Sequence, residues 1–201
     1  MADFHFSNFS KKENQVYEQF RSWRDRLFHP FCTLLKKTPF TPDQISYAGL
    51  SMGVLFVLFL PQNLWLALLA LILHVFFDGL DGAYARFLNM KNSKGELLDR
   101  ACDYAIFFVI FAAFMYYHVL NPWWGFVYFV NYTIMVFLTA TLNHLRIEFP
   151  YILKTKYFVY LFFLIWVVSG FNFFDPLIVF FAVYSIIANL FLFHRLRCSL
   201  S

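Results

Sequence analysis

Residues 64–88, LWLALLALILHVFFDGLDGAYARFL, decide the fold class of this chain. The first half of the stretch is apolar except for His74, and Asp78 and Asp81 follow near its end. A helix that crosses a bilayer needs roughly 20 mostly apolar residues, because the hydrocarbon core is about 30 Å thick. We therefore predict that this stretch is a membrane-spanning helix that carries carboxylates close to one of its ends.

The composition of the whole chain agrees with a membrane protein. Of its 201 residues, 61% are hydrophobic, 23% are aromatic and 14% are charged. Soluble globular proteins are about 45–50% apolar and about 25% charged. A disordered chain and a cytosolic enzyme are therefore excluded. Three scattered cysteines also provide no disulfide framework, which excludes a small secreted scaffold.

Five further apolar stretches accompany the first, separated by short polar or proline-containing breaks. The six predicted spans are residues 42–60, 64–88, 96–120, 122–145, 157–173 and 175–194. With six spans, both termini lie on one side, and all 16 Lys and Arg residues fall on that same side. The positive-inside rule then places both termini in the cytoplasm. We expect an all-α, multi-pass integral membrane protein.

The first 40 residues are expected to form a separate cytoplasmic or interfacial segment before the membrane domain at residues 41–201. Apolar residues recur at helical spacing and would share one face of an amphipathic helix. They are Val16, Phe20, Trp23 and Leu27. A helix that lies in the headgroup region is the favoured interpretation, and a solvated tail is the alternative. No signal peptide is expected, because no apolar run precedes a small-residue cleavage site.

Four carboxylates lie in or next to the second and third predicted spans. They are Asp78, Asp81, Asp99 and Asp103. An ionised side chain at membrane depth costs roughly 2.5–3.5 kcal/mol on insertion scales, so these groups need partners. Helical spacing puts each pair on one face, and the short connection makes the two helices antiparallel neighbours whose acidic faces can meet. A hard divalent cation, Mg²⁺ or Mn²⁺ rather than Zn²⁺, suits such all-oxygen ligands.

Small residues and an arginine accompany the acidic face. Gly82 and Ala85 lie on it, and Arg86 has a planar fork that suits phosphate oxygens. Gly79 and Ala83 are nearby, and taken alone they are better explained by close packing of helices. For Gly82 and Ala85, next to four carboxylates and an arginine, we favour a ligand site.

This pattern resembles the signature of the CDP-alcohol phosphotransferase (CDP-alcohol phosphatidyltransferase) family. The matching positions are Asp78, Asp81, Gly82, Ala85, Arg86, Gly95, Asp99 and Asp103. The resemblance implies a six-span enzyme that moves a phospho-group from a CDP-linked donor to a hydroxyl group and releases CMP. It also implies that the four aspartates bind two divalent cations and that Asp103 is the general base. The residues implied to line the CDP site are Gly82, Ala85, Arg86 and Gly95.

The resemblance allows two assignments of donor and acceptor. The favoured donor is CDP-diacylglycerol with a small polar alcohol as acceptor, as in the bacterial branch of the family. The alternative is transfer of a CDP-linked choline or ethanolamine headgroup to diacylglycerol. An ion or proton transporter that uses the buried aspartates is an alternative from another class. We expect a homodimer in the bacterial inner membrane rather than the endoplasmic reticulum, an active site on the cytoplasmic face, and no nucleic-acid partner.

Three cationic residues are candidates for binding a phosphorylated acceptor such as glycerol 3-phosphate or inositol phosphate. They are Arg146, Lys154 and Lys156, at the cytoplasmic ends of the fourth and fifth predicted spans. The alternative is that these charges only set the membrane topology.

Three other features are weighed against structural explanations. Residues 41–46, TPDQIS, are similar to a family segment near the cytidine, but Asp43 stands where the family more often has Asn. Thr41 and Pro42 explain this segment equally well as the start of a helix. We expect His74 to be a hydrogen-bonded interior histidine and Cys102 to be a packing residue.

Overall fold

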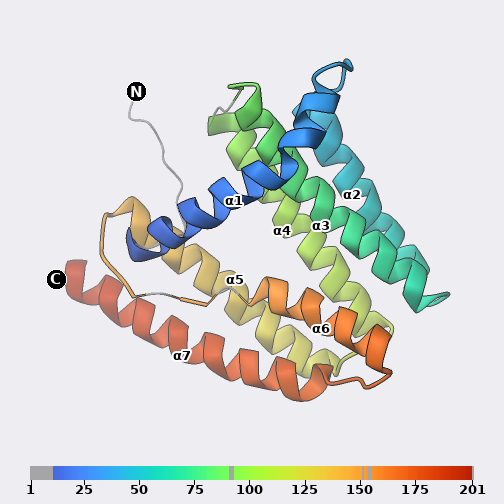
Figure 1. Cartoon of the computed structure of the whole chain (residues 1–201). Coiled ribbons are helices and arrows are strands. Elements are labelled where there is room, and N and C mark those ends of the chain that lie inside the picture. Colours follow the sequence, from blue (N-terminus) through green and yellow to red (C-terminus); the bar gives the residue numbers. More distant parts are fainter. Residues whose placement is uncertain (1–10, 91–92, 151, 154, 201) are drawn as a thin grey trace. The chain divides into compact units, whose positions relative to one another are not determined.

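The computed structural model describes residues 11–90, 93–150, 152–153 and 155–200, with no side chains described for residues 11–18, 93–101 and 200. The regular secondary structure of these residues is entirely helical, which confirms the all-α prediction. The helices, labelled in Figure 1, are α1 (Lys11–Leu35), α2 (Pro42–Phe59), α3 (Leu64–Phe87), α4 (Ser93–Tyr116), α5 (Pro122–His144), α6 (Lys156–Ser169) and α7 (Phe174–Leu200).

Helix starts follow from local capping chemistry. The Thr41 side chain accepts a hydrogen bond from the Gln44 amide, and the Gln44 side chain accepts one from the Thr41 amide, with Pro42 in the first turn. Asn63 caps α3 and Asn121 caps α5 by accepting hydrogen bonds from the amides that follow them. The structural explanation of residues 41–46 as the start of a helix is therefore confirmed, and a place near the cytidine stays a prediction.

Three helices end four or more residues from their predicted ends. The third predicted span extends to residue 120, but α4 ends at Tyr116. The fifth predicted span extends to residue 173, but α6 ends at Ser169 because Gly170 adopts a left-handed conformation with φ 75°. The sixth predicted span ends at residue 194, whereas α7 continues to Leu200. Helix ends are the least predictable part of such a chain, because one cap decides them.

Three helical segments in the described residues are long and apolar enough to cross a membrane. They are Leu64–Phe87, Pro122–His144 and Phe174–Ser199. The apolar segments Cys102–Tyr116 and Lys156–Ser169 are shorter, at 10–17 residues. Each predicted span coincides with a helix, and the number of six membrane crossings stays a prediction.

The chain forms two compact units, one comprising Tyr17–Ala113 and the other mainly Phe114–Ser201. The first contains most of α1, then α2, α3 and most of α4. The second contains α5, α6 and α7. The predicted separation of residues 1–40 from residues 41–201 stays a prediction.

In the first unit, α2 packs closely on α3 and α4 because glycines face them. A Cβ atom on Gly49 would lie 3.2 Å from the Cβ of Phe77, and one on Gly53 would lie 2.8 Å from Ile106 Cδ1. His74 Nδ1 donates a hydrogen bond of 2.9 Å to the Gly49 carbonyl, which confirms the expected interior role of this histidine. These contacts bring the middle portions of α2, α3 and α4 close together.

The helix α1 has two apolar faces. Phe20, Trp23 and Leu27 are all more than half exposed, and the Val16 side chain lies outside the described residues. The other face packs against α3 in a buried cluster. Its members are Phe28, Cys32, Ile45, Leu80, Ala83 and Tyr84. The predicted helix is therefore present, and its place in the headgroup region stays a prediction.

Candidate active site

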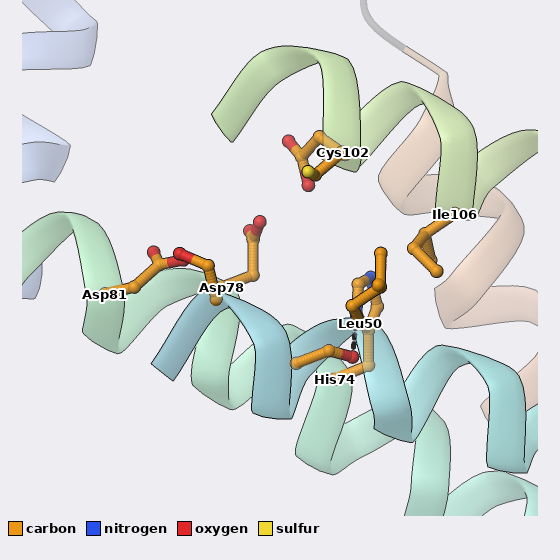
Figure 2. Close-up of a pocket in the computed structure, with 9 residues that line it drawn as sticks. Leu50, His74, Asp78, Asp81, Cys102 and Ile106 are labelled. Atoms are coloured by element: carbon orange, nitrogen blue, oxygen red, sulfur yellow. Dashed lines mark hydrogen bonds between the residues drawn. The ribbon is translucent and has the colours of Figure 1, made fainter. Parts of the chain in front are cut away.

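A small cavity lies among α2, α3 and α4 in the first unit, with about 20 Å³ of room for water-sized groups. Figure 2 shows the side chains that line it, with Asp78 of α3 directed toward α4. The lining residues are Ser46, Gly49, Leu50, His74, Asp78, Asp81, Cys102, Asp103 and Ile106. The cavity thus brings together aspartates from two helices that the sequence pattern assigns to one site.

Asp81 is a buried carboxylate that two hydrogen bonds hold in place. It is 5% exposed, and its Oδ2 accepts a hydrogen bond from Ser46 Oγ across from α2. Its Oδ1 accepts a second hydrogen bond from the backbone amide of Gly82. Two donors on a buried carboxylate fix its orientation. Sequence reasoning missed Ser46 as a partner, although it weighed the segment that contains it.

Asp78 and Asp103 are half-buried and line the same cavity from opposite helices. Asp99 and Gly95 are part of helix α4. The side chain of Asp99 and the surroundings of Gly95 are not described. Cys102, expected only to pack, also lines the cavity.

The oxygen ligands that line the cavity are chemically suited to a divalent cation. The cavity offers three carboxylates, and hard cations such as Mg²⁺ and Mn²⁺ prefer oxygen ligands. Among the side chains that the structure describes, no group of three or more His, Cys, Asp or Glu residues could by itself hold a metal ion. The fit to a divalent cation thus rests on the kind of ligand atoms that line the cavity.

Arg86 lies one turn beyond Asp81 and is paired with an acidic residue of α1. Its Nε donates a hydrogen bond of 2.9 Å to Asp25 Oδ2, and its Nη2 contacts Asp25 Oδ1. Burial raises the pKa of the nearby Cys32 thiol, the Asp25 charge raises it further, and the Arg86 charge lowers it. Sequence reasoning missed Asp25, because no local pattern links residues of α1 to residues of α3.

Gly82 and Arg86, both predicted to bind the donor, lie together on this face of α3. A Cβ atom on Gly82 would lie 3.2 Å from Arg86 Nη1, so a larger residue would crowd the guanidinium group. Ala85 is half-buried beside them. Gly79 and Ala83 instead contact or join the buried cluster with Phe28, which supports the packing explanation for these two residues.

The predicted acceptor-binding residues belong to the second unit. Arg146 follows α5 directly, is exposed and has φ 58°. Lys156 starts α6, is 8% exposed, and holds its Nζ 5.5 Å from the centre of the Tyr157 ring. Lys154 lies outside the described residues. Their part in acceptor binding stays a prediction.

Comparison with known proteins identifies the family. The family model described as CDP-alcohol phosphatidyltransferase matches residues 40–193, which is more than half of the chain. The chain belongs to this family. The match confirms the resemblance found in the sequence, and members of the family generally use divalent metal ions. The family and the three long apolar helices indicate a membrane protein.

The chain matches only part of the length of each of these curated relatives. Inner membrane protein YnjF of Escherichia coli is 34% identical over 85 residues, which are 42% of this chain and 41% of the relative. The phosphatidylinositol phosphate synthase of Mycobacteroides abscessus is 28% identical over 117 residues, which are 57% of this chain and 52% of the relative. The chain thus spans about two fifths to one half of the length of these curated relatives.

A solved structure supports the fold. The crystal structure of the phosphatidylinositol phosphate synthase of Mycobacterium tuberculosis with CDP-DAG bound is similar, with a TM-score of 0.66 and 21% sequence identity. The similarity covers 85% of this chain and 93% of the other. The helical architecture is therefore that of a known membrane enzyme fold.

Proposed function

We propose that this protein transfers the phosphatidyl group of CDP-diacylglycerol to the hydroxyl group of a small polar alcohol and releases CMP. The observation that carries the proposal is the cavity that Asp78, Asp81 and Asp103 line together, with Gly82 and Arg86 following on the same helix. A site with several carboxylates and an adjacent guanidinium fork suits a phosphate ester bound with divalent cations. Membership of the family supports the same reaction class.

The carboxylates have two roles in this proposal. Asp78, Asp81, Asp99 and Asp103 would hold two divalent cations, Mg²⁺ or Mn²⁺, which when bound neutralise the charge of the donor diphosphate. The hydrogen bonds from Ser46 and Gly82 orient Asp81 for this task.

Asp103 is proposed as the general base. As the acceptor oxygen forms its bond to the donor phosphorus and the bond to the CMP oxygen breaks, Asp103 receives the hydroxyl proton. Gly82, Ala85, Arg86 and Gly95 are proposed to line the CDP site, where the fork of Arg86 binds phosphate oxygens. Alignment and charge stabilisation by these groups account for most of such catalysis.

The acceptor is proposed to be a phosphorylated alcohol, with inositol phosphate and glycerol 3-phosphate as the first candidates. The similarity to the phosphatidylinositol phosphate synthase of Mycobacteroides abscessus supports inositol phosphate. Arg146, Lys154 and Lys156 are the residues proposed to bind the acceptor phosphate. Their guanidinium and ammonium groups supply the positive charge that this ligand requires.

In the membrane, we propose six spans with both termini and the active site on the cytoplasmic face, in a homodimer of the bacterial inner membrane. The distribution of Lys and Arg supports this orientation. The exposed Phe20, Trp23 and Leu27 support a headgroup location for α1, because these rings and chains would enter the boundary with the acyl chains.

The experiment is a panel of alcohols given to the purified protein with CDP-diacylglycerol and Mg²⁺ or Mn²⁺, with CMP as the readout. Glycerol 3-phosphate, inositol phosphate, inositol, serine and choline are added separately. A response to one phosphorylated alcohol supports the proposal in full. CMP formed only from CDP-choline or CDP-ethanolamine with diacylglycerol reverses donor and acceptor, and no CMP in any combination contradicts the enzyme proposal and favours transport.

A further inference from the structure

The N-terminal helix α1 brings charged side chains to the last turns of α3, which follow the cavity residue Asp81. The helix α1 packs on α3 through the buried Phe28 and Cys32, which join Tyr84 in one cluster. Arg24 and Asp25 precede Phe28 on the same helix and so lie against the last turns of α3. Both residues are outside the family signature.

Arg24 lies beside two glycines of α3. A Cβ atom on Gly79 would lie 3.8 Å from Arg24 Cδ, and one on Gly82 would lie 3.9 Å from Arg24 Nη2. The same position on Gly82 lies 3.2 Å from Arg86 Nη1. Two guanidinium groups therefore flank Gly82, the residue that directly follows the cavity residue Asp81.

The guanidinium group of Arg24 has unused hydrogen-bonding capacity. Its Nε is buried, and within the described part of the chain no group accepts a hydrogen bond from it. A buried donor of a charged group is costly without an acceptor, so proteins normally pair it. The position of Arg24 thus suits an anion that the neighbouring side chains do not supply.

The neighbouring Arg86 shows what kind of anion fits here. Its Nε contacts Oδ2 of Asp25, and its Nη2 contacts Oδ1. A guanidinium fork binds carboxylate and phosphate through the same planar pair of hydrogen bonds. Asp25 therefore occupies a position that an oxyanion of a ligand can take.

We propose that Arg24 binds a phosphate oxygen of the CDP-linked donor together with Arg86, and that this phosphate replaces the Asp25 carboxylate in the fork of Arg86. The inference rests on the proposed function and adds a donor-binding residue from α1. A diphosphate has enough oxygens to bind both guanidinium groups, whereas one carboxylate is used up by Arg86 alone. The phosphate of a bilayer lipid has the same chemistry, so the experiment must separate the two sources.

The test compares Arg24→Met with Arg26→Met in the purified full chain. Methionine keeps an apolar stem beside Gly79 and removes the charge, and Arg26 is an exposed control on the same helix. The affinities for CDP and cytidine are measured by calorimetry with Mn²⁺, and the KM for CDP-diacylglycerol is measured by CMP release. Loss of a charge-assisted hydrogen bond is expected to weaken CDP binding and raise this KM about tenfold. Cytidine affinity and the control stay unchanged.

The outcomes separate this inference from the proposed function. If the wild type binds CDP and releases CMP, but Arg24→Met and Arg26→Met have equal CDP affinity and KM, the inference is wrong and the proposed function stands. If the wild type neither binds CDP nor releases CMP, the proposed function fails and the inference fails with it.

A second measurement distinguishes donor phosphate from lipid phosphate. The rise in Tm on addition of phosphatidylglycerol is compared with the rise on addition of CDP for both variants. If Arg24→Met loses only the effect of phosphatidylglycerol, Arg24 binds a bilayer lipid and the donor role is overturned. If Arg24→Met is too unstable to purify, Arg24→Gln, which keeps hydrogen-bonding capacity at the buried position, is measured with the same two readings.

Discussion

The cavity among α2, α3 and α4 and the connection from α5 to α6 hold their polar side chains in different ways. In the cavity, Asp81 is 5% exposed and receives hydrogen bonds from two directions. After α5, Arg146 is exposed on a backbone with φ 58°. Residues proposed for the chemistry are thus fixed by packing between helices, whereas a residue proposed to select the acceptor lies on a connecting segment that tolerates change.

The largest effect is expected for a substitution of a cavity residue. Asp103→Asn removes the proposed base and is expected to lower kcat about 10³-fold, within the range for general acid–base catalysis. Donor affinity should fall far less than kcat, because Asp78, Asp81 and Asp99 remain to hold the cations proposed to bind the diphosphate. CMP release and CDP calorimetry measure the two quantities. Turnover near that of the wild type would remove Asp103 from this role.

A smaller and more selective effect is expected at the connection after α5. Arg146→Ala should raise the KM for a phosphorylated alcohol about tenfold, because a charge-assisted hydrogen bond contributes about 1.5–3 kcal/mol. The KM for CDP-diacylglycerol and the Tm should not change, since Arg146 is exposed. Arg197→Ala, an exposed residue near the end of α7, is the matched control. Equal acceptor KM values for the two variants would leave Arg146 with a topological role only.

The hydrogen bond between α2 and α3 provides a test of how far packing sets activity. Ser46→Ala removes a donor to the buried Asp81 and is expected to lower kcat/KM about fivefold, as a hydrogen bond to a charged group is lost. Ser51→Ala is the control, because Ser51 is exposed and its hydroxyl group donates a hydrogen bond to the Tyr47 carbonyl of its own helix. If both variants keep wild-type kcat/KM, the orientation of Asp81 does not depend on Ser46.

The smallest expected effect concerns the close approach of α2 to α4. Gly53→Ala would place a Cβ atom 2.8 Å from Ile106 Cδ1, and such overpacking costs about 1–3 kcal/mol. We expect a Tm lower by several degrees, at about 2–4 °C per kcal/mol for a chain of this size. The double variant Gly53→Ala with Ile106→Val should recover part of the loss. A Tm equal to that of the wild type would show that the two helices separate easily.

Much of the fold was predictable because its signals are local. Thr41, Asn63 and Asn121 cap helices through amides a few residues away, and the apolar stretches between them have the length of helices. The family signature was equally readable, since its residues lie within one pair of neighbouring helices. The end of α6 was missed, because the conformation of the single residue Gly170 decides it.

The sequence by itself determined the helical class and the family and proposed the aspartates of the candidate site, because helical periodicity and signature spacing are properties of contiguous residues. Only the tertiary structure decided that Ser46 holds Asp81, that Asp25 holds Arg86 and that Arg24 lies beside Gly82. These pairs join helices that are distant in the chain. Their contacts depend on which face each helix buries, and α1 carries two apolar faces, one exposed and one packed on α3. Periodicity reveals that a face is apolar, but the neighbouring helix decides which one is buried.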